Sequence, residues 1–170
     1  RFQNARCSLV ALDARLGVPG LPQSGTDQTA LFTGVNAPRI FGRHFGPWVP
    51  VSLRPLLGQQ NVLSRARAQG RSIAFANAYP EEVFAEGRKA RDPLRAGPPI
   101  AALGAGVMNR HTPELQRGDA IASEIINEGW RTHLQRPDLP VITAREAGHN
   151  LVHIAAQHDL TLFAHYSTDH

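Results

Sequence analysis

Three stretches of the chain carry the apolar pattern of buried β-strands. Residues 7–12 form a short apolar run that ends before a loop rich in glycine and proline, and residues 71–79 and 160–166 are similar runs. Short apolar runs bounded by turn residues are typical of strands covered on both faces, as in parallel sheets. The first run contains the single cysteine, Cys7, which we expect to be a small core residue.

Four other stretches place their apolar residues at helical spacing. They are residues 24–32, 53–68, 119–134 and 143–157. Thr143 and Glu146 have the spacing of a capping box at the start of the last of these helices. Helices and strands therefore alternate, which predicts an α/β protein with helices layered around a mostly parallel sheet.

A candidate site lies where a predicted strand and loop give way to a helix, in residues 21–34. Ser24 opens that helix. A turn of this kind leaves free backbone N–H groups and the positive end of the helix dipole at one point, which suits a phosphate or another anion. The Ser24 hydroxyl is a candidate nucleophile or metal ligand there; the alternative is that Ser24 only caps the helix.

Three further residues are candidates for binding a substrate. Arg43 and His44 lie in a loop rich in glycine, proline and aromatic residues, and both side chains can hold an anion. Simple packing of that loop, with Arg43 solvated, is the alternative. Asn77 stands at the end of a predicted strand, where it either faces the site or caps a helix that begins near Glu81.

His149 and His153 are four residues apart in a predicted helix, so they share one face and could hold a metal ion together. The three residues between them include no glutamate, which the metalloprotease helix motif requires. We therefore expect solvent-facing histidines rather than a zinc site.

Composition and charge limit the kinds of molecule that we expect the chain to bind. The chain is 42% hydrophobic and 19% charged, with a formal charge of +4, and Lys89 is its only lysine. Arginine favours phosphate and carboxylate groups. The arginines are scattered without interleaved aromatic residues, so nucleic acid is not the expected partner, although an arginine-rich nucleic-acid module stays as a third hypothesis. A lone cysteine and the absence of a long apolar stretch favour a cytoplasmic protein outside the membrane.

Two parts of the chain resemble the alkaline phosphatase superfamily. In SGTDQTALFTGVNAP, residues 24–38, a serine opens a helix that ends in Thr-Gly, as in the nucleophile segment of that superfamily. The preceding LGVPGLPQ and the later FANAYP, residues 75–80, resemble metalloenzyme-domain proteins related to cofactor-independent phosphoglycerate mutase and phosphopentomutase. DLTLF and YSTDH, within residues 159–170, look like the strand that delivers a metal-binding aspartate. The resemblance covers most of the chain.

The resemblance implies a partial, alkaline-phosphatase-like metalloenzyme domain over residues 1–170, with a small cap-like insertion around 88–118. It implies a metal-dependent phosphoryl-transfer enzyme or phosphoester hydrolase acting on a small phosphorylated or other anionic ester. Ser24 would be the nucleophile and a metal ligand, and Asp169 would bind one of two divalent ions, zinc or manganese.

Several ligands of that family's metal cage have no counterpart in the sequence. Asp13 is not in the Asp-Gly context of the first ligand, and the Asp-His pair and later histidine of the family are missing. We therefore expect an internal fragment with little or no activity by itself. The alternative is a non-catalytic module of the same fold that uses the Ser24 turn to bind phosphate or another anion.

Overall fold

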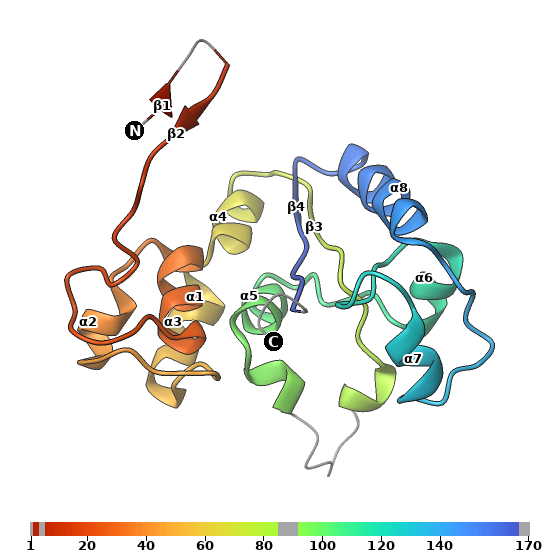
Figure 1. Cartoon of the computed structure of the whole chain (residues 1–170), viewed down its shortest axis with the longest axis horizontal. Coiled ribbons are helices and arrows are strands. Elements are labelled where there is room, and N and C mark those ends of the chain that lie inside the picture. The colour runs from red at the N-terminus through yellow and green to blue at the C-terminus, as the bar shows by residue number, and fades with distance from the viewer. Residues whose placement is uncertain (1, 4–5, 85–91, 167–170) are drawn as a thin grey trace.

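The computed structural model describes residues 2–3, 6–84 and 92–166 and shows a mixed α/β fold (Figure 1). A central pair of strands separates a group of helices early in the chain from a second group late in it. The α-helices of the first group are α1 (Ser24–Thr33), α2 (Ala37–Phe41), α3 (Arg54–Gln59) and α4 (Val62–Ala68). Those that follow the first central strand are α5 (Gly97–Gly104), α6 (Thr112–Arg117), α7 (Glu128–Thr132) and α8 (Ala144–Ala156). Short 3-10 helices are η1 (Val51–Leu53), η2 (Glu81–Phe84) and η3 (Asp92–Arg95).

The central strands β3 (Ile73–Phe75) and β4 (Leu160–Leu162) are parallel, with Ile73 opposite Leu160. The parallel arrangement confirms the α/β class predicted from the sequence, although the described sheet is small. Just beyond β3, the backbone of Asn77 forms a bridge to Ile121, so the other side of this segment is also paired. No helix in the part of the chain that the structure describes is long and apolar enough to cross a membrane.

Asn77 joins the ends of the two central strands. Its side-chain amide donates to the Ala164 carbonyl oxygen at 2.7 Å, and the Ala164 N–H donates to Asn77 Oδ1 at 2.8 Å. The side chain is almost fully buried, with 1% exposure. Asn77 therefore acts in this structure as a replacement for the next rung of the β3–β4 ladder, and it does not cap η2.

Helix α5 lies at the centre of the packing. Ile100 and Ala101 pack with α1 and α3, whereas Ala102 packs with Phe75 of β3. A Cβ atom on Gly104 would collide with the backbone of Gly58, so α3 and α5 approach each other closely at these two glycines. The described part of the segment predicted as a cap-like insertion thus includes a core helix.

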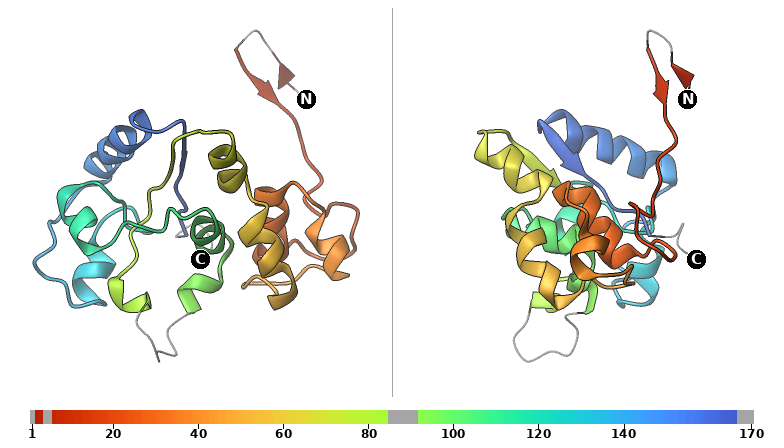
Figure 2. Two further views of the ribbon diagram at one scale, coloured as in Figure 1. Left: turned by 180° about the vertical axis from the view of Figure 1, so that it is seen from behind. Right: turned by 90° about the vertical axis from the view of Figure 1, so that its left-hand side faces the viewer.

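The N-terminal segment differs from the buried strand predicted for residues 7–12. Strands β1 (Phe2–Gln3) and β2 (Ser8–Leu9) pair only with each other and project away from the helices (Figure 2). Cys7 is exposed, and Leu12 is 87% exposed. The buried strand predicted for residues 7–12 is therefore wrong for this structure, because the run has no strand or helix of the body against which to pack.

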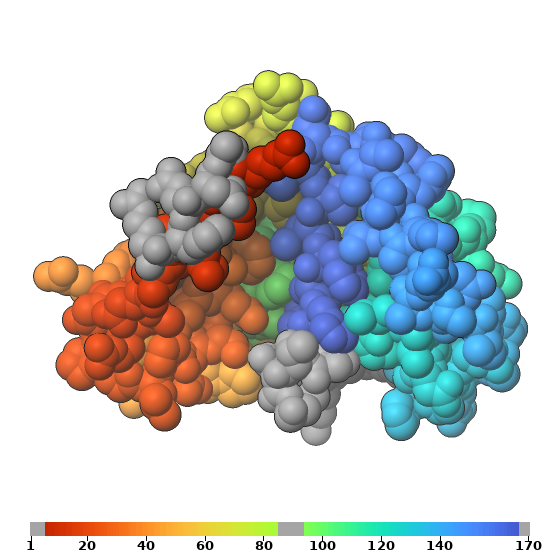
Figure 3. All heavy atoms as spheres, turned by 45° about the horizontal axis from the view of Figure 1, so that its top comes forward, coloured from red at the N-terminus to blue at the C-terminus, as the bar shows by residue number. Residues whose placement is uncertain are grey.

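Three other predicted elements are shorter or less covered than expected. The helix predicted over 53–68 is divided into α3 and α4, because buried Asn61 caps α4 by accepting from the Ser64 N–H at 3.0 Å. The helix predicted over 119–134 is reduced to α7, because Ile121 uses its backbone to pair with the β3 segment. Strand β4 is half-buried rather than covered on both faces, and it lies open on the face shown in Figure 3.

Substitution of Asn77 by alanine is expected to lower the free energy of unfolding by about 2–4 kcal/mol, because it removes two buried hydrogen bonds and leaves Ala164 unpaired. Urea denaturation followed by circular dichroism measures the loss. The control is Asn109→Ala at an exposed position, which should change stability by less than about 0.5 kcal/mol. Equal loss in the two variants would contradict the bridging role of Asn77.

The predicted capping box of α8 is confirmed, and it makes a pH-dependent contribution to stability. Glu146 accepts from the Thr143 N–H at 2.7 Å and from its hydroxyl at 2.8 Å, and these bonds hold the pKa of Glu146 below its usual value. A carboxylate with a lowered folded-state pKa stabilises the fold above its unfolded pKa, and the contribution is lost as the pH falls through the folded pKa.

Glu146→Gln should therefore unfold at lower urea concentration than the wild type at pH 7, because it loses the ionised partner of Thr143. The difference should shrink as the pH is lowered from about 5 to about 3, where wild-type Glu146 becomes protonated. Urea midpoints measured across this range test the expectation. A difference that stays constant with pH would show that the charge of Glu146 has no part in the effect.

Candidate functional site

Ser24 is the first residue of α1, and it does not cap the helix. The capping position is held by Gln23, whose backbone is extended and whose side chain makes no capping hydrogen bond. The backbone N–H groups of Ser24 and Gly25 precede the first intrahelical bond and have no acceptor among the described residues. The Ser24 hydroxyl therefore lies beside a free amide at the start of the helix, whereas Gly25 is buried and does not line the neighbouring cavity; binding of an anion there stays a prediction.

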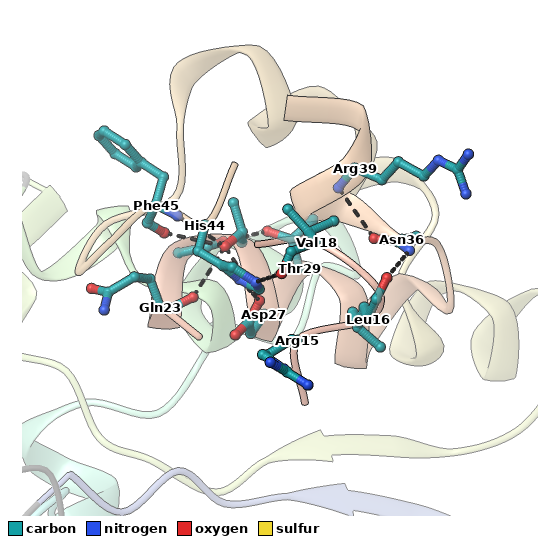
Figure 4. A network of polar contacts seen from close by, with 12 residues as sticks. Arg15, Leu16, Val18, Gln23, Asp27, Thr29, Asn36, Arg39, His44 and Phe45 are labelled. Carbon is teal, nitrogen blue, oxygen red and sulfur yellow. Dashed lines mark hydrogen bonds and ion pairs between the residues drawn. The ribbon is translucent and has the colours of Figure 1, made fainter. Parts of the chain in front are cut away.

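A loop of residues 44–48 packs against the first turn of α1 (Figure 4). The Thr26 N–H donates to the Phe45 carbonyl oxygen at 2.9 Å, and the Phe45 N–H donates to Thr26 Oγ1 at 3.1 Å. Thr26 is fully buried. This reciprocal pair fixes the helix N-terminus against the loop without using the hydroxyl of Ser24.

Gly25 allows this close approach. A Cβ atom at Gly25 would lie 2.7 Å from the Phe45 carbonyl oxygen and closer still to that of Trp48. Backbone atoms cannot move aside as a flexible side chain can, so a side chain at this position would push the loop from the helix.

Asp27 and His44 form a second link between the helix and the loop. His44 Nδ1 lies 3.1 Å from Asp27 Oδ1, and His44 Nε2 lies 3.3 Å from the Val18 carbonyl oxygen. The His44 side chain is only 3% exposed. Both of its ring nitrogens are engaged in holding the loop, so in this structure His44 positions the site rather than offering a free group to a substrate.

Ser24 and Asp27 line the same cavity, which has a volume of about 630 Å³ and is walled mainly by apolar residues of α1 and of the loops before and after it. The second carboxylate oxygen, Asp27 Oδ2, is buried and has no hydrogen-bond partner among the described residues. The sequence analysis missed Asp27. Its position three residues after Ser24, in the first turn of the same helix, was the available signal.

The other predicted substrate-binding residues do not line the Ser24 cavity. Arg43 is exposed, and its guanidinium carbon lies 6.0 and 5.7 Å from the ring centroids of Phe41 and Phe45. This arrangement agrees with the alternative in which the loop simply packs and Arg43 is solvated. Asn77 is buried in its link to Ala164. Asp169 lies outside the described residues, so its predicted role as a metal ligand stays a prediction.

The candidate metal ligands of α8 are placed as expected for surface histidines. His149 and His153 are both exposed, and His153 Nε2 lies 2.8 Å from the side-chain nitrogen of Gln157. Within the described ranges, no group of three or more histidine, cysteine, aspartate or glutamate side chains is arranged to hold a metal ion. The described residues by themselves do not fit a two-metal centre.

Comparison of the chain with protein-family models, with curated proteins and with solved structures found no match. The resemblance to the alkaline phosphatase superfamily therefore rests on the motifs around Ser24, residues 75–80 and residues 159–170.

Gly25→Ala should lower the free energy of unfolding by about 1–3 kcal/mol or prevent the loop from docking, because the added methyl group meets backbone atoms. Thermal or urea unfolding measures this change. Gly148→Ala is the matched control: Gly148 lies inside α8 with open space around its Cβ position, so alanine there should stabilise the protein by about 0.5–1 kcal/mol. Wild-type stability in Gly25→Ala would contradict the close approach.

Proposed function

We propose that the chain carries the nucleophile segment of a metal-dependent phosphoryl-transfer enzyme or phosphoester hydrolase, with Ser24 as the attacking residue. The observation that carries the proposal is that Ser24, which opens a ten-residue helix and does not cap it, lines a cavity of about 630 Å³ that extends along this helix as far as Asn36. The substrate class is a small phosphorylated or other anionic ester. The unused amide of Ser24, together with the helix dipole, favours an anionic oxygen beside Ser24.

In this proposal, one residue reacts with the substrate and others hold the site in place. The Ser24 hydroxyl accepts the phosphoryl group, while the Thr26–Phe45 and Asp27–His44 contacts keep the helix N-terminus and loop in place. His44 is not placed as a general base, because both of its ring nitrogens are engaged. An unassisted serine hydroxyl is a poor nucleophile at neutral pH, so the proposal needs an activating group.

In the resembling family, two divalent ions supply that activation. Asp27 Oδ2, buried and without a partner, offers one oxygen near Ser24, but the described residues hold too few ligands to build the centre. We therefore derive no step through a metal. The chain by itself is expected to show little or no turnover.

A non-catalytic module that binds phosphate or another anion is the second candidate. The free amide of Ser24 at the start of α1 favours it, because an amide at a helix N-terminus needs no metal ion to bind an anion. Asp27 opposes it, because its carboxylate lines the same cavity and repels an anion unless a cation intervenes. Metal dependence of phosphate binding therefore separates the two candidates.

Titration calorimetry with inorganic phosphate, with and without Mn²⁺, tests the proposal. We expect binding only in the presence of Mn²⁺, weakened about tenfold or more in Ser24→Ala and unchanged in Ser8→Ala, a control at an exposed serine. Binding that persists with a chelator and needs Ser24 would favour the non-catalytic module. Absence of phosphate binding under both conditions would reject both candidates.

Turnover of p-nitrophenyl phosphate gives an independent readout of the same proposal. The wild-type chain with Mn²⁺ or Zn²⁺ is expected to be close to the rate of the metal-containing buffer. Clear turnover that disappears in Ser24→Ala would show that the chain does assemble enough metal ligands for catalysis, against the expectation of an inactive chain.

A further inference from the structure

A second cavity, of about 560 Å³, opens beyond the carboxyl end of β3. The chain leaves β3 through Asn77 and enters the cavity wall at Ala78 and Tyr79. Helices η2 and α7, which lie side by side in Figures 1 and 2, supply Val83 and Trp130 to the same wall. In open α/β sheets, ligands bind outside the carboxyl ends of the parallel strands, so this is a position where a binding site is expected.

The apolar wall of this cavity is anchored in the core. Trp130 is 5% exposed and packs in one cluster with Ala78, while Tyr79 is 7% exposed and stacks on Phe75 with ring centroids 6.1 Å apart. The His111 ring nitrogen Nδ1, 3.0 Å from the Tyr79 carbonyl oxygen, also holds this segment. Trp130 is therefore fixed before any ligand arrives, which is typical of small-molecule sites, whereas the Tyr79 ring packs in another cluster with Phe75.

The rim of the cavity carries a cation whose backbone is held in place. The Arg136 N–H donates to the Trp130 carbonyl oxygen at 3.2 Å, and Gln135 just before it adopts a left-handed conformation with φ of 54°. The Arg136 guanidinium pairs with Glu82 through Nη2. Among the described residues it has no other acceptor, so its Nε and Nη1 groups can donate to a ligand.

Ser123 adds a polar group to the wall. Its hydroxyl oxygen accepts from the Asn77 side-chain amide at 3.3 Å, which leaves the hydroxyl hydrogen for another acceptor. The cavity therefore combines a fixed aromatic wall with a hydroxyl donor and a guanidinium at its rim.

We propose that this cavity binds a small ligand that joins a planar apolar ring to an anionic group. The ring contacts Val83 and Trp130, and the anionic group binds Arg136 in competition with Glu82. The proposal does not depend on Ser24, because the two cavities share none of their lining residues.

Phenylphosphonate, which has a ring and an anion and no ester bond to cleave, is the probe. In Trp48→Phe, Trp130 is the remaining tryptophan and reports on this cavity by fluorescence. We expect a saturable change with phenylphosphonate and affinities at least about tenfold weaker for benzyl alcohol and for methylphosphonate, which lack the anion and the ring respectively.

Two variants at the rim should change the affinity in opposite directions. Arg136→Gln should weaken binding about tenfold, whereas Glu82→Gln should tighten it several-fold, because the competing carboxylate is removed. Both side chains are partly exposed, so the fold should tolerate these changes.

Ser24→Ala should leave binding of phenylphosphonate unchanged. The proposal is overturned if no saturable signal appears, if benzyl alcohol binds as well as phenylphosphonate, or if Arg136→Gln binds it as tightly as the wild type. It is also overturned if Ser24→Ala abolishes binding, because the ligand then occupies the Ser24 cavity.

Discussion

The buried backbone of residues 74–79 must find hydrogen-bond partners on both sides, and most of the structure depends on how it does so. All six residues are at most 7% exposed. The Ala76 N–H donates to the Leu162 carbonyl oxygen at 2.8 Å, and the Ala78 N–H donates to that of Ile121 at 2.9 Å. Because a buried peptide group without a partner is costly, these bonds draw two distant segments onto one strand.

The two cavities are formed by different structural elements. The Ser24 cavity lies along α1 and the loops on either side of it, and its free backbone amide is at the start of that helix. The Arg136 cavity depends on the end of a strand, where buried aromatic residues meet a charged turn. The two proposals therefore give an anion different partners, a backbone amide in the first cavity and a guanidinium in the second.

Local rules predicted part of this arrangement from the sequence. The start of α1 at Ser24, its stop at Gly34 and the Thr143–Glu146 capping box depend on neighbouring residues alone, and all are present. Other features depend on which distant segment packs opposite. They are the exposure of residues 7–12, the division of the helix predicted over 53–68, and the hydrogen bonds made by His44 and Asn77. A single sequence carries no direct signal of such distant contacts: the spacing of Asp27 from Ser24 can be noticed locally, but its contact with His44, seventeen positions away, cannot.

The link between Asn77 and Ala164 spans 87 positions in the chain. During synthesis on the ribosome, β3 therefore emerges long before the strand with which it pairs. Helices α1 to α4 can form by local contacts in that interval, whereas the apolar β3 segment waits without its parallel neighbour. Pauses in translation between these two strands would lengthen the time during which a chaperone, or another nascent chain, can bind it.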